Sequence, residues 1–230
     1  MRSRETICIG IPHDGTIDTQ MTLDLVSLMS ERKPRIDSMQ LVQGLGLLAR
    51  TRNIIVKNFL NDSKADWLLM VDSDQSLSIE VFDLLVETAH KDDRPMVAGL
   101  VFAAFYDADL LRPVPAIYNI AADGAMMPID DYPKNEIFRI DGAGTGCLLV
   151  HRTVLQAMRE NASPNQGTDW CWFFDGALDG RWFSEDLLFC RKATALGFPI
   201  FVHTGAILGH HKQFWLDDRH HDQWKAGTKN

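Results

Sequence analysis

Two aspartates follow a run of apolar residues that has the length of a buried strand. The run is WLLMV, residues 67–71, and Asp72-Ser73-Asp74 comes directly after it. In an open α/β sheet, ligands bind outside the carboxyl ends of the strands. Two carboxylates held together there need a cation between them, and the hard cations Mg²⁺ and Mn²⁺ prefer carboxylate and phosphate oxygens. The pattern predicts a metal site, and the alternative is a solvated loop in which Asp74 caps the next helix.

A second pair of carboxylates opens a later helix. Ser184-Glu185-Asp186 precedes an apolar stretch that ends at Gly197. Acidic residues in a first helical turn favour the helix dipole and Ser184 is a suitable N-cap, so a structural role would explain the pattern by itself. The functional interpretation makes one of the two carboxylates a general base that accepts a hydroxyl proton.

Histidines gather near the end of the chain. Gly209-His210-His211 follows a predicted strand, and an imidazole there could complete a Mn²⁺ site begun by the two aspartates. The alternative is a pair of surface histidines. Because His220 and His221 follow, a zinc site is a further alternative, although no cysteine stands close by to complete a familiar zinc module.

A glycine-rich segment, Gly142-Ala143-Gly144-Thr145-Gly146, leads into another predicted strand. It lacks the order of a Walker or dinucleotide-binding motif, because no lysine follows and the next element is a strand rather than a helix. The glycines predict close approach of the backbone to a ligand or to another strand, and the alternative is a bulge or tight turn.

The elements that must position these residues alternate along the chain. Apolar runs predict strands at 6–11, 36–42, 67–71, 96–102, 146–150 and 199–203. Apolar residues at helical spacing predict helices at 22–30, 45–60, 79–90, 152–159 and 185–196. We therefore expect an α/β fold with a mostly parallel central sheet flanked by helices. Residues 105–137 and 161–180 break the alternation and are expected to form loops or a small hairpin.

Composition narrows the function classes. The chain has 230 residues, which fits one α/β domain, and a formal net charge of −8, which counts against nonspecific binding to nucleic acid. Cys8, Cys147, Cys171 and Cys190 are widely spaced, as in a reduced protein. No stretch approaches the roughly 20 apolar residues that span a bilayer, and no signal peptide is evident. We expect a cytoplasmic protein that does not insert into membranes.

Taken in order, these motifs resemble those of the GT-A nucleotide-sugar glycosyltransferases, and of their compact family-2-like group in particular. The resemblance runs from about residue 7 to 210 and rests on five segments: IGIPHDG, LLARTRNIIVKNFL, ADWLLMVDSD, DGAGTGCLLVHR and WFSEDLLFCRKATALGFPIFVHTGAILGHH. It implies a single Rossmann-like GT-A domain over 1–230. The nucleotide-binding half would span about 1–102, the acceptor and catalytic half about 103–211, and the tail 212–230 would be a candidate lid.

The resemblance also implies a role for each matching residue on the donor side. Pro12 and Asp14 would line the pocket for the base and ribose. The diphosphate and the donor sugar would be held by residues from three motifs: Arg50, Arg52, Asn53, Asp72, Ser73, Gly144, Thr145 and Gly146. The metal ion, Mn²⁺ or Mg²⁺, would be bound by Asp72, Asp74 and His210.

On the acceptor side, the resemblance makes Asp186 the base that deprotonates the acceptor hydroxyl, while Glu185 would orient the acceptor or support the site. Trp172 and Trp182 are candidates for stacking on the acceptor, and the alternative is that such aromatic residues pin a loop to the core. The implied activity is metal-dependent transfer of a sugar, with inversion, from a UDP-sugar or, as second choice, a GDP-sugar. The acceptor stays open among a small molecule, a glycan, a protein and a modified nucleic-acid base.

Two other functions compete with this one. A nucleotidyltransferase on a related scaffold would need a basic, glycine-rich loop near the first strand, where His13-Asp14-Gly15-Thr16 stands instead. A non-catalytic module that binds a nucleotide sugar or glycan would be expected to lose the DxD or ED motif, and both are present.

Overall fold

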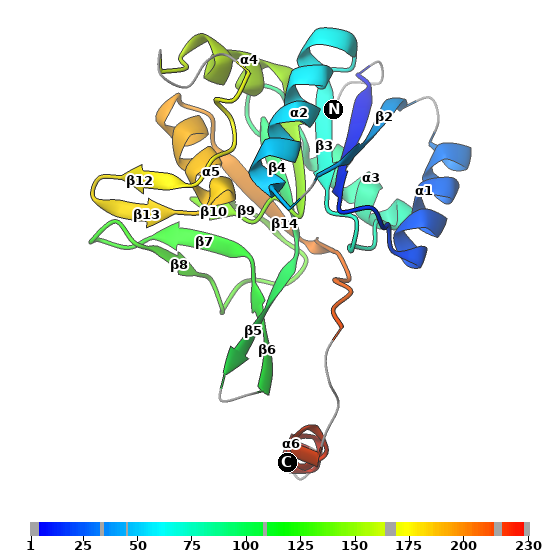
Figure 1. The fold of residues 1–230 in the computed structure, drawn as a ribbon, viewed down its shortest axis with the longest axis vertical. Coiled ribbons are helices and arrows are strands. Elements are labelled where there is room, and N and C mark those ends of the chain that lie inside the picture. The colour runs from blue at the N-terminus through cyan, green and yellow to red at the C-terminus, as the bar shows by residue number, and fades with distance from the viewer. Residues whose placement is uncertain are drawn as a thin grey trace.

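A seven-stranded sheet forms the centre of the molecule (Figure 1). The computed structural model describes residues 5–32, 35–44, 46–107, 110–163, 169–213 and 218–227. Across the sheet the strands are ordered β2 (Ile36–Gln43), β1 (Ile7–His13), β3 (Trp67–Val71), β11 (Cys147–His151), β4 (Met96–Leu100), β14 (Ile200–Ile207) and β9 (Ile137–Ile140).

Most of these strands run in one direction. Strand β1 pairs parallel with β2 and β3, and β14 pairs parallel with β4. Strand β11 is antiparallel to both β3 and β4, so β3 and β4 point the same way, and β9 is antiparallel to β14. The predicted mostly parallel sheet is therefore confirmed, with β11 and β9 as the two reversed strands.

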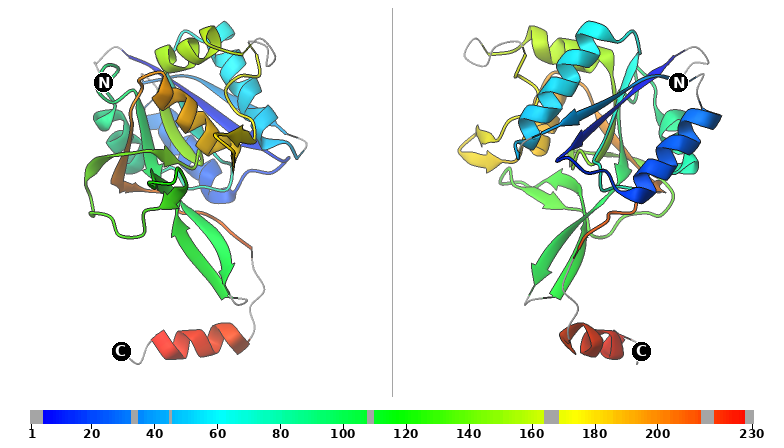
Figure 2. Two further views of the ribbon diagram at one scale, coloured as in Figure 1. Left: turned by 90° about the vertical axis from the view of Figure 1, so that its left-hand side faces the viewer. Right: turned by 45° about the vertical axis from the view of Figure 1, so that its right-hand side comes forward.

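Helices cover both faces of this sheet (Figure 2). Helices α1 (Thr19–Glu31) and α3 (Ile79–Thr88) pack on one face, where their apolar residues join those of β1 and β3 in one buried cluster. Helices α2 (Leu48–Asp62), α4 (Arg152–Glu160) and α5 (Glu185–Ala195) pack on the other face in a second buried cluster. Strands buried on both faces read as continuous apolar runs, which is why β3 and β4 could be predicted from the sequence.

Three small sheets project from the central one (Figure 1). They are the hairpin β5 (Phe102–Asp107) and β6 (Leu110–Pro115), the sheet β10 (Gly142–Ala143), β7 (Ile117–Ile120) and β8 (Met126–Pro128), and the hairpin β12 (Gly176–Leu178) and β13 (Arg181–Phe183). The expectation of loops or one small hairpin for 105–137 was too simple, and strand β9 was missed. Strands β8, β10, β12 and β13 have only two or three residues, which is too few to carry a recognisable periodicity.

The last described element, α6 (Asp218–Gly227), lies away from the central sheet (Figure 1). The segment 214–217 that leads to it is outside the described residues, so the lid suggested for the tail stays a prediction. In the part of the chain that the structure describes, no helix is both long and apolar enough to cross a membrane.

Gly10 in β1 offers a test of this packing. A Cβ atom added there would overlap Cγ2 of Ile55 on α2, and that methyl group cannot move aside because it is attached to the Cβ atom of a fully buried residue. We expect Gly10→Ala to lower the free energy of unfolding by about 1–3 kcal/mol in urea. Gly176→Ala is the control, since its nearest neighbours would be 3.5 Å away, and equal stability of the two variants would contradict the packing.

Candidate nucleotide and metal site

The carboxyl ends of β1 and β3 open at the same edge of the sheet, because the two strands are parallel neighbours. A hollow of about 380 Å³ lies at this edge. Its lining includes six of the predicted site residues: Pro12, Asp14, Asp72, Ser73, Asp74 and His210. The remaining lining residues are His13, Gly44, Gly46, Leu47, Leu48, Thr51 and Lys212.

The segment after β14 reaches this hollow because backbone hydrogen bonds fasten it to the loop after β3. Ser76 N donates to Gly209 O at 2.9 Å, and His211 N donates to Asp74 O at 2.8 Å. Gln75 and His210 form an antiparallel bridge. Residues separated by more than 130 positions in the sequence thereby share one corner, as the sequence motifs predicted.

His210 faces Asp74 with a defined ring orientation. Its Nδ1 donates to the carbonyl oxygen of Phe102 at 2.6 Å, since a carbonyl oxygen can only accept, and its Nε2 lies 3.1 Å from Asp74 Oδ2. Burial lowers the pKa of His210, but these two hydrogen bonds outweigh it and raise the pKa. Anchoring one ring nitrogen on a carbonyl is how proteins orient a metal-binding histidine.

Lys212 shares the same carboxylate oxygen, with its Nζ 2.7 Å from Asp74 Oδ2. Burial raises the pKa of Asp74, but the hydrogen bonds from His210 and Lys212 outweigh this effect and bring the pKa to about 2. Asp74 is therefore an anion at neutral pH, next to a cation that could also face a phosphate. Lys212 was missed in the sequence, although its position two residues after His210 could have pointed to it.

Among the described residues, no group of three or more His, Cys, Asp or Glu side chains is close enough to hold a metal ion by itself. The protein offers two ligand groups at one point, the Asp74 carboxylate and His210 Nε2. Carboxylate and imidazole suit Mn²⁺, and diphosphate oxygens are a usual source of further ligands for such ions. The residues present therefore fit a metal ion that binds together with a diphosphate.

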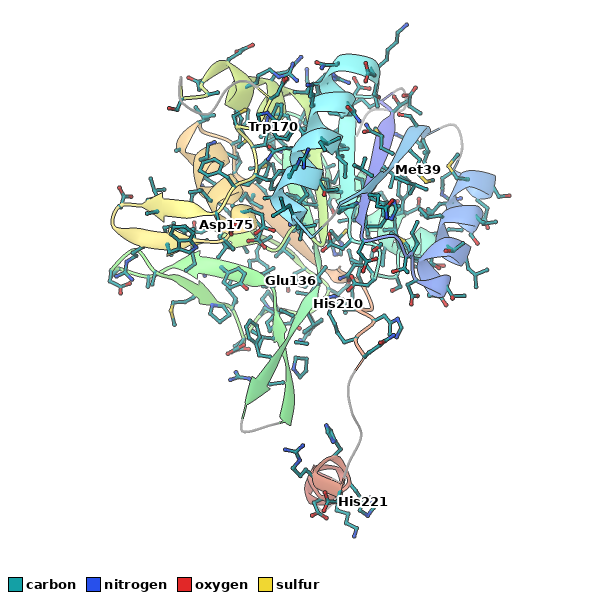
Figure 3. All side chains as sticks on the ribbon, in the orientation of Figure 1. Met39, Glu136, Trp170, Asp175, His210 and His221 are labelled. Atoms are coloured by element: carbon teal, nitrogen blue, oxygen red, sulfur yellow. The ribbon has the colours of Figure 1, made fainter. Side chains whose placement is uncertain are left out.

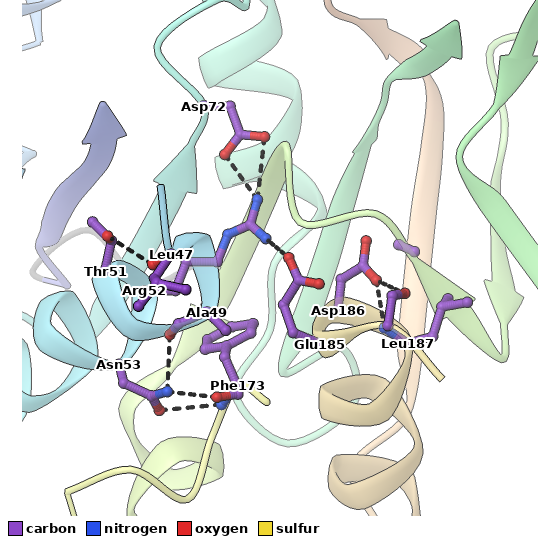
Figure 4. A network of polar contacts seen from close by, with 12 residues as sticks. Leu47, Ala49, Thr51, Arg52, Asn53, Asp72, Phe173, Glu185, Asp186 and Leu187 are labelled. Atoms are coloured by element: carbon purple, nitrogen blue, oxygen red, sulfur yellow. Dashed lines mark hydrogen bonds and ion pairs between the residues drawn. The ribbon is translucent and has the colours of Figure 1, made fainter. Parts of the chain in front are cut away.

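Asp72 is held by an arginine instead. Arg52 Nη2 donates to both Asp72 oxygens, at 2.9 and 3.2 Å, and Arg52 Nη1 donates to Glu185 Oε1 at 2.6 Å (Figure 4). The Arg52 side chain is only 3% exposed. Burial lowers its pKa, but the carboxylates of Asp72, Glu185 and Asp186 outweigh this effect and raise it. Arg52 thus links the DxD and ED motifs and does not line the hollow, contrary to its predicted role on the diphosphate.

The two acidic residues at the start of α5 have different surroundings. Burial, the largest effect, raises the pKa of Glu185 and outweighs the opposite effect of Arg52. Asp186 Oδ1 accepts hydrogen bonds from Ser184 Oγ and from Leu187 N, the latter at 2.8 Å. Asp186 Oδ2 lies 3.6 Å from the position that a Cβ atom on Gly144 would occupy. Asp186 is thus oriented by its own helix and faces the glycine-rich segment.

The glycine-rich segment runs between the two acidic motifs. A Cβ atom on Gly146 would lie 3.4 Å from Asp72 Oδ2, while Gly144 approaches Asp186 Oδ2. Thr145 between them is 1% exposed, and its hydroxyl has no hydrogen-bond partner among the described residues. The expected close approach of the glycine-rich backbone to another strand is present, because Gly142 and Ala143 pair with β7 and Gly144 N donates to Ala116 O at 2.8 Å.

Three of the predicted site residues lie outside the lining of the hollow. Asn53 is buried, and its amide pins the loop before β12, donating to Phe173 O and accepting from the N–H groups of Trp172 and Phe173. Arg50 is exposed on α2 and is absent from the lining of the hollow. Trp172 is completely buried and donates to Leu155 O at 2.9 Å, so it cannot stack on an acceptor. Exposed Trp182 on β13 keeps that option.

Comparison with known proteins identifies the fold. No family model matches the chain, and no curated protein matches it in sequence. A197 from STIV superposes with a TM-score of 0.55 at 16% identity, covering 90% of this chain and 86% of that one. GalNAc-T7, in a structure with UDP, GalNAc and Mn²⁺, superposes with a TM-score of 0.51 at 12% identity, covering 93% of this chain and 45% of its own.

The chain is similar in fold to GalNAc-T7. It spans less than half the length of that chain. This likeness confirms the predicted fold, one α/β domain whose large central sheet is flanked by helices. The roles of individual residues rest on the geometry described above.

Arg52 provides the test of this geometry. Replacing it with methionine leaves two half-buried carboxylates without their cation, so we expect Arg52→Met to lower the free energy of unfolding by about 1–3 kcal/mol at pH 7. Burial raises the pKa of Glu185 and Arg52 lowers it, so loss of Arg52 raises the pKa further. As the pH falls, the folded variant therefore takes up a proton before its unfolded chain does and before the folded unaltered protein does, which stabilises the variant more. The loss of unfolding free energy caused by Arg52→Met should therefore be smaller at pH 5 than at pH 7.

Urea unfolding at the two pH values measures this effect. Arg52→Lys is the matched control, because it keeps the positive charge while losing one arm of the bridge. A deficit that is the same at both pH values, or larger for Arg52→Lys than for Arg52→Met, would contradict the bridge.

Proposed function

We propose that the chain is a metal-dependent glycosyltransferase that moves a sugar from a nucleotide-sugar donor to an acceptor hydroxyl. The observation that carries this proposal is the pairing of Asp74 with the carbonyl-anchored His210 beside the hollow lined by Pro12 and Asp14. Its place at the carboxyl edge of a GT-A-like sheet supports the same conclusion.

The donor would occupy the hollow at the ends of β1 and β3. A volume of about 380 Å³ is in the range of small-molecule sites. The base and ribose would lie against Pro12 and Asp14, and the diphosphate would lie toward Asp74, where Lys212 supplies a positive charge. We take a UDP-sugar as the first candidate and a GDP-sugar as the second.

Asp74 and His210 would hold the metal ion, which is Mn²⁺ or Mg²⁺. When bound, such an ion neutralises the negative charge that develops on a departing diphosphate. Asp72 stays oriented by Arg52, at the edge of the hollow nearest the glycine-rich segment. The role of Arg52 would be to keep Asp72 and Glu185 at a fixed separation.

Asp186 would be the general base. Since Ser184 and Leu187 both donate to Oδ1, the carboxylate is held in one orientation, with Oδ2 toward the backbone at Gly144. An acceptor hydroxyl within hydrogen-bond reach of Oδ2 would lose its proton as its oxygen attacks the anomeric carbon from the face opposite the leaving diphosphate. This arrangement gives inversion of configuration.

Donor binding tests the first half of this proposal. Calorimetric titration with UDP and with GDP, each with Mn²⁺ or with EDTA, should give saturable binding of one nucleotide only when the metal is present. Asp74→Ala should weaken that binding about a hundredfold or more, because loss of a supporting partner alone costs 10- to 100-fold. Asp93→Ala, on an exposed loop, is the control. Unchanged affinity in Asp74→Ala would refute the metal assignment, and no nucleotide binding at all would favour a module that lacks the enzyme's activity.

Turnover tests the second half. Asp186→Asn should keep nucleotide affinity while slowing donor hydrolysis, with water in place of the acceptor, by roughly a hundred- to ten-thousandfold. Asp179→Asn, on the neighbouring hairpin and 79% exposed, should leave both unchanged. Near-normal turnover in Asp186→Asn would mean that another residue is the base.

A further inference from the structure

A second hollow, of about 370 Å³, lies beside the start of α5 and is named the hairpin slot. Its lining includes Met126 on β8, Arg181, Trp182 and Phe183 on β13, and Ser184 and Leu187 at the start of α5. The hairpins β7–β8 and β12–β13 lie next to each other at this side of the molecule (Figure 1). No residue of the slot belongs to the donor hollow.

An ion pair joins the two hairpins across the slot. Arg181 Nη2 lies 2.9 Å from Asp123 Oδ2 in the turn between β7 and β8. Met126 and Leu187 pack together over Gly142, where an added Cβ atom would overlap Met126 and lie 3.0 Å from Leu187. The slot is therefore a built feature with an apolar floor and a charged rim.

Trp182 is the most exposed of the large apolar side chains, at 73%, among the described residues (its hairpin is drawn in yellow in Figure 3). It stands opposite Ala177 in the hairpin, and this small neighbour leaves the indole ring uncovered. Small-molecule sites combine apolar and aromatic lining with a few polar groups, and Trp182 lines a hollow of this composition. The ring offers an apolar face, while Arg181, Asp123 and Ser184 offer hydrogen-bonding groups around it.

The slot leads to the candidate base. Ser184 lines the slot and donates its hydroxyl to Asp186 Oδ1, and Leu187 lines the slot and donates its backbone N–H to the same oxygen. A molecule in the slot therefore touches the two residues that orient Asp186. Arg52 and Asp72 reach the acidic pair from the other side, through Glu185.

We propose that the hairpin slot binds a saccharide, one ring of which stacks on Trp182, and that the acceptor is accordingly a carbohydrate. This inference rests on the proposed transferase function. A pyranose ring combines an apolar face with hydroxyl groups at its edge, which matches the indole and the polar groups around it. A nucleic acid fits less well, because the cation of the slot, Arg181, is already paired with Asp123 and the net charge is −8.

The test follows the indole N–H signals in proton–nitrogen NMR spectra of the ¹⁵N-labelled protein. Trp182→Phe assigns the Trp182 signal by its absence. The probes are maltose, cellobiose, lactose and N,N′-diacetylchitobiose at up to 20 mM, a concentration of the order used for weak, millimolar binding. An unglycosylated peptide that contains serine and threonine is the rival probe. We expect at least one disaccharide to shift the Trp182 signal saturably, while the buried Trp67 and Trp172 stay unchanged.

Variants separate stacking from a change in folding. Trp182→Ala should weaken binding of the same saccharide about tenfold. Trp182→Phe should weaken it less, because phenylalanine keeps an aromatic face. Trp170→Ala is the control, since Trp170 is also exposed, at 44%, but lies outside the slot. Thermal unfolding of each variant verifies that it is folded. Because these substitutions replace side chains at the surface, we expect every variant to fold.

Each outcome decides the inference. No shift of Trp182 with any disaccharide, a shift with the peptide alone, or equal weakening by Trp170→Ala would overturn it. Titration of the unaltered protein with UDP and Mn²⁺ separates the two proposals. Saccharide shifts without nucleotide binding would leave the slot as a carbohydrate site on a protein that is not a transferase, and nucleotide binding without saccharide shifts would leave a transferase whose acceptor is another class.

Discussion

The buried guanidinium of Arg52 is the interaction on which the candidate site depends. It brings a carboxylate from the end of β3 and another from the first turn of α5 to opposite sides of one planar group (Figure 4). Burial raises the pKa of Glu185, so the charged form of this carboxylate depends on its pairing with Arg52. The bridge therefore fixes the distance between the end of the sheet and helix α5, and with it the position of Asp186, the next residue of the helix.

Around this bridge the site divides into two sides. On one side the hollow at β1 and β3 carries Asp14, Asp74 and His210, and on the other the hairpin slot carries Trp182. The glycine-rich segment passes between them, with Gly146 facing Asp72 and Gly144 facing Asp186. A Cβ atom would lie 3.4 Å from Asp72 Oδ2 at Gly146 and 3.6 Å from Asp186 Oδ2 at Gly144, so a larger side chain at either glycine would crowd one of these carboxylates.

The surroundings of Asp74 depend on a separate set of hydrogen bonds. The segment 209–212 is fastened to the loop after β3 by backbone hydrogen bonds, so that His210, Lys212 and the carbonyl of Phe102 all converge near Asp74. Asp74 and Asp72 stand two residues apart, yet they have different partners. Asp74 faces a histidine and a lysine, whereas Asp72 faces an arginine.

The sequence by itself determined the fold class and the order of the motifs. Continuous apolar runs such as WLLMV predict buried strands, and polar residues directly after parallel strands lie at the ligand-binding edge of the sheet. Asp72, Asp74 and His210 line the hollow at that edge. The sequence could not determine which polar side chains form hydrogen bonds and ion pairs within the protein itself. Arg52 and Asn53 are adjacent on α2, and the sequence predicts that both bind the donor. In the structure Arg52 pairs with two carboxylates, and Asn53 forms hydrogen bonds with backbone groups of a distant loop. Trp172 and Trp182 were equivalent in the sequence. In the structure Trp172 is buried, with hydrogen bonds to Asn53 and Leu155, whereas Trp182 is exposed on strand β13. Local sequence patterns predict the secondary structure that a residue belongs to. The burial of its side chain and its hydrogen-bond partners depend on segments that can be more than a hundred residues away in the sequence.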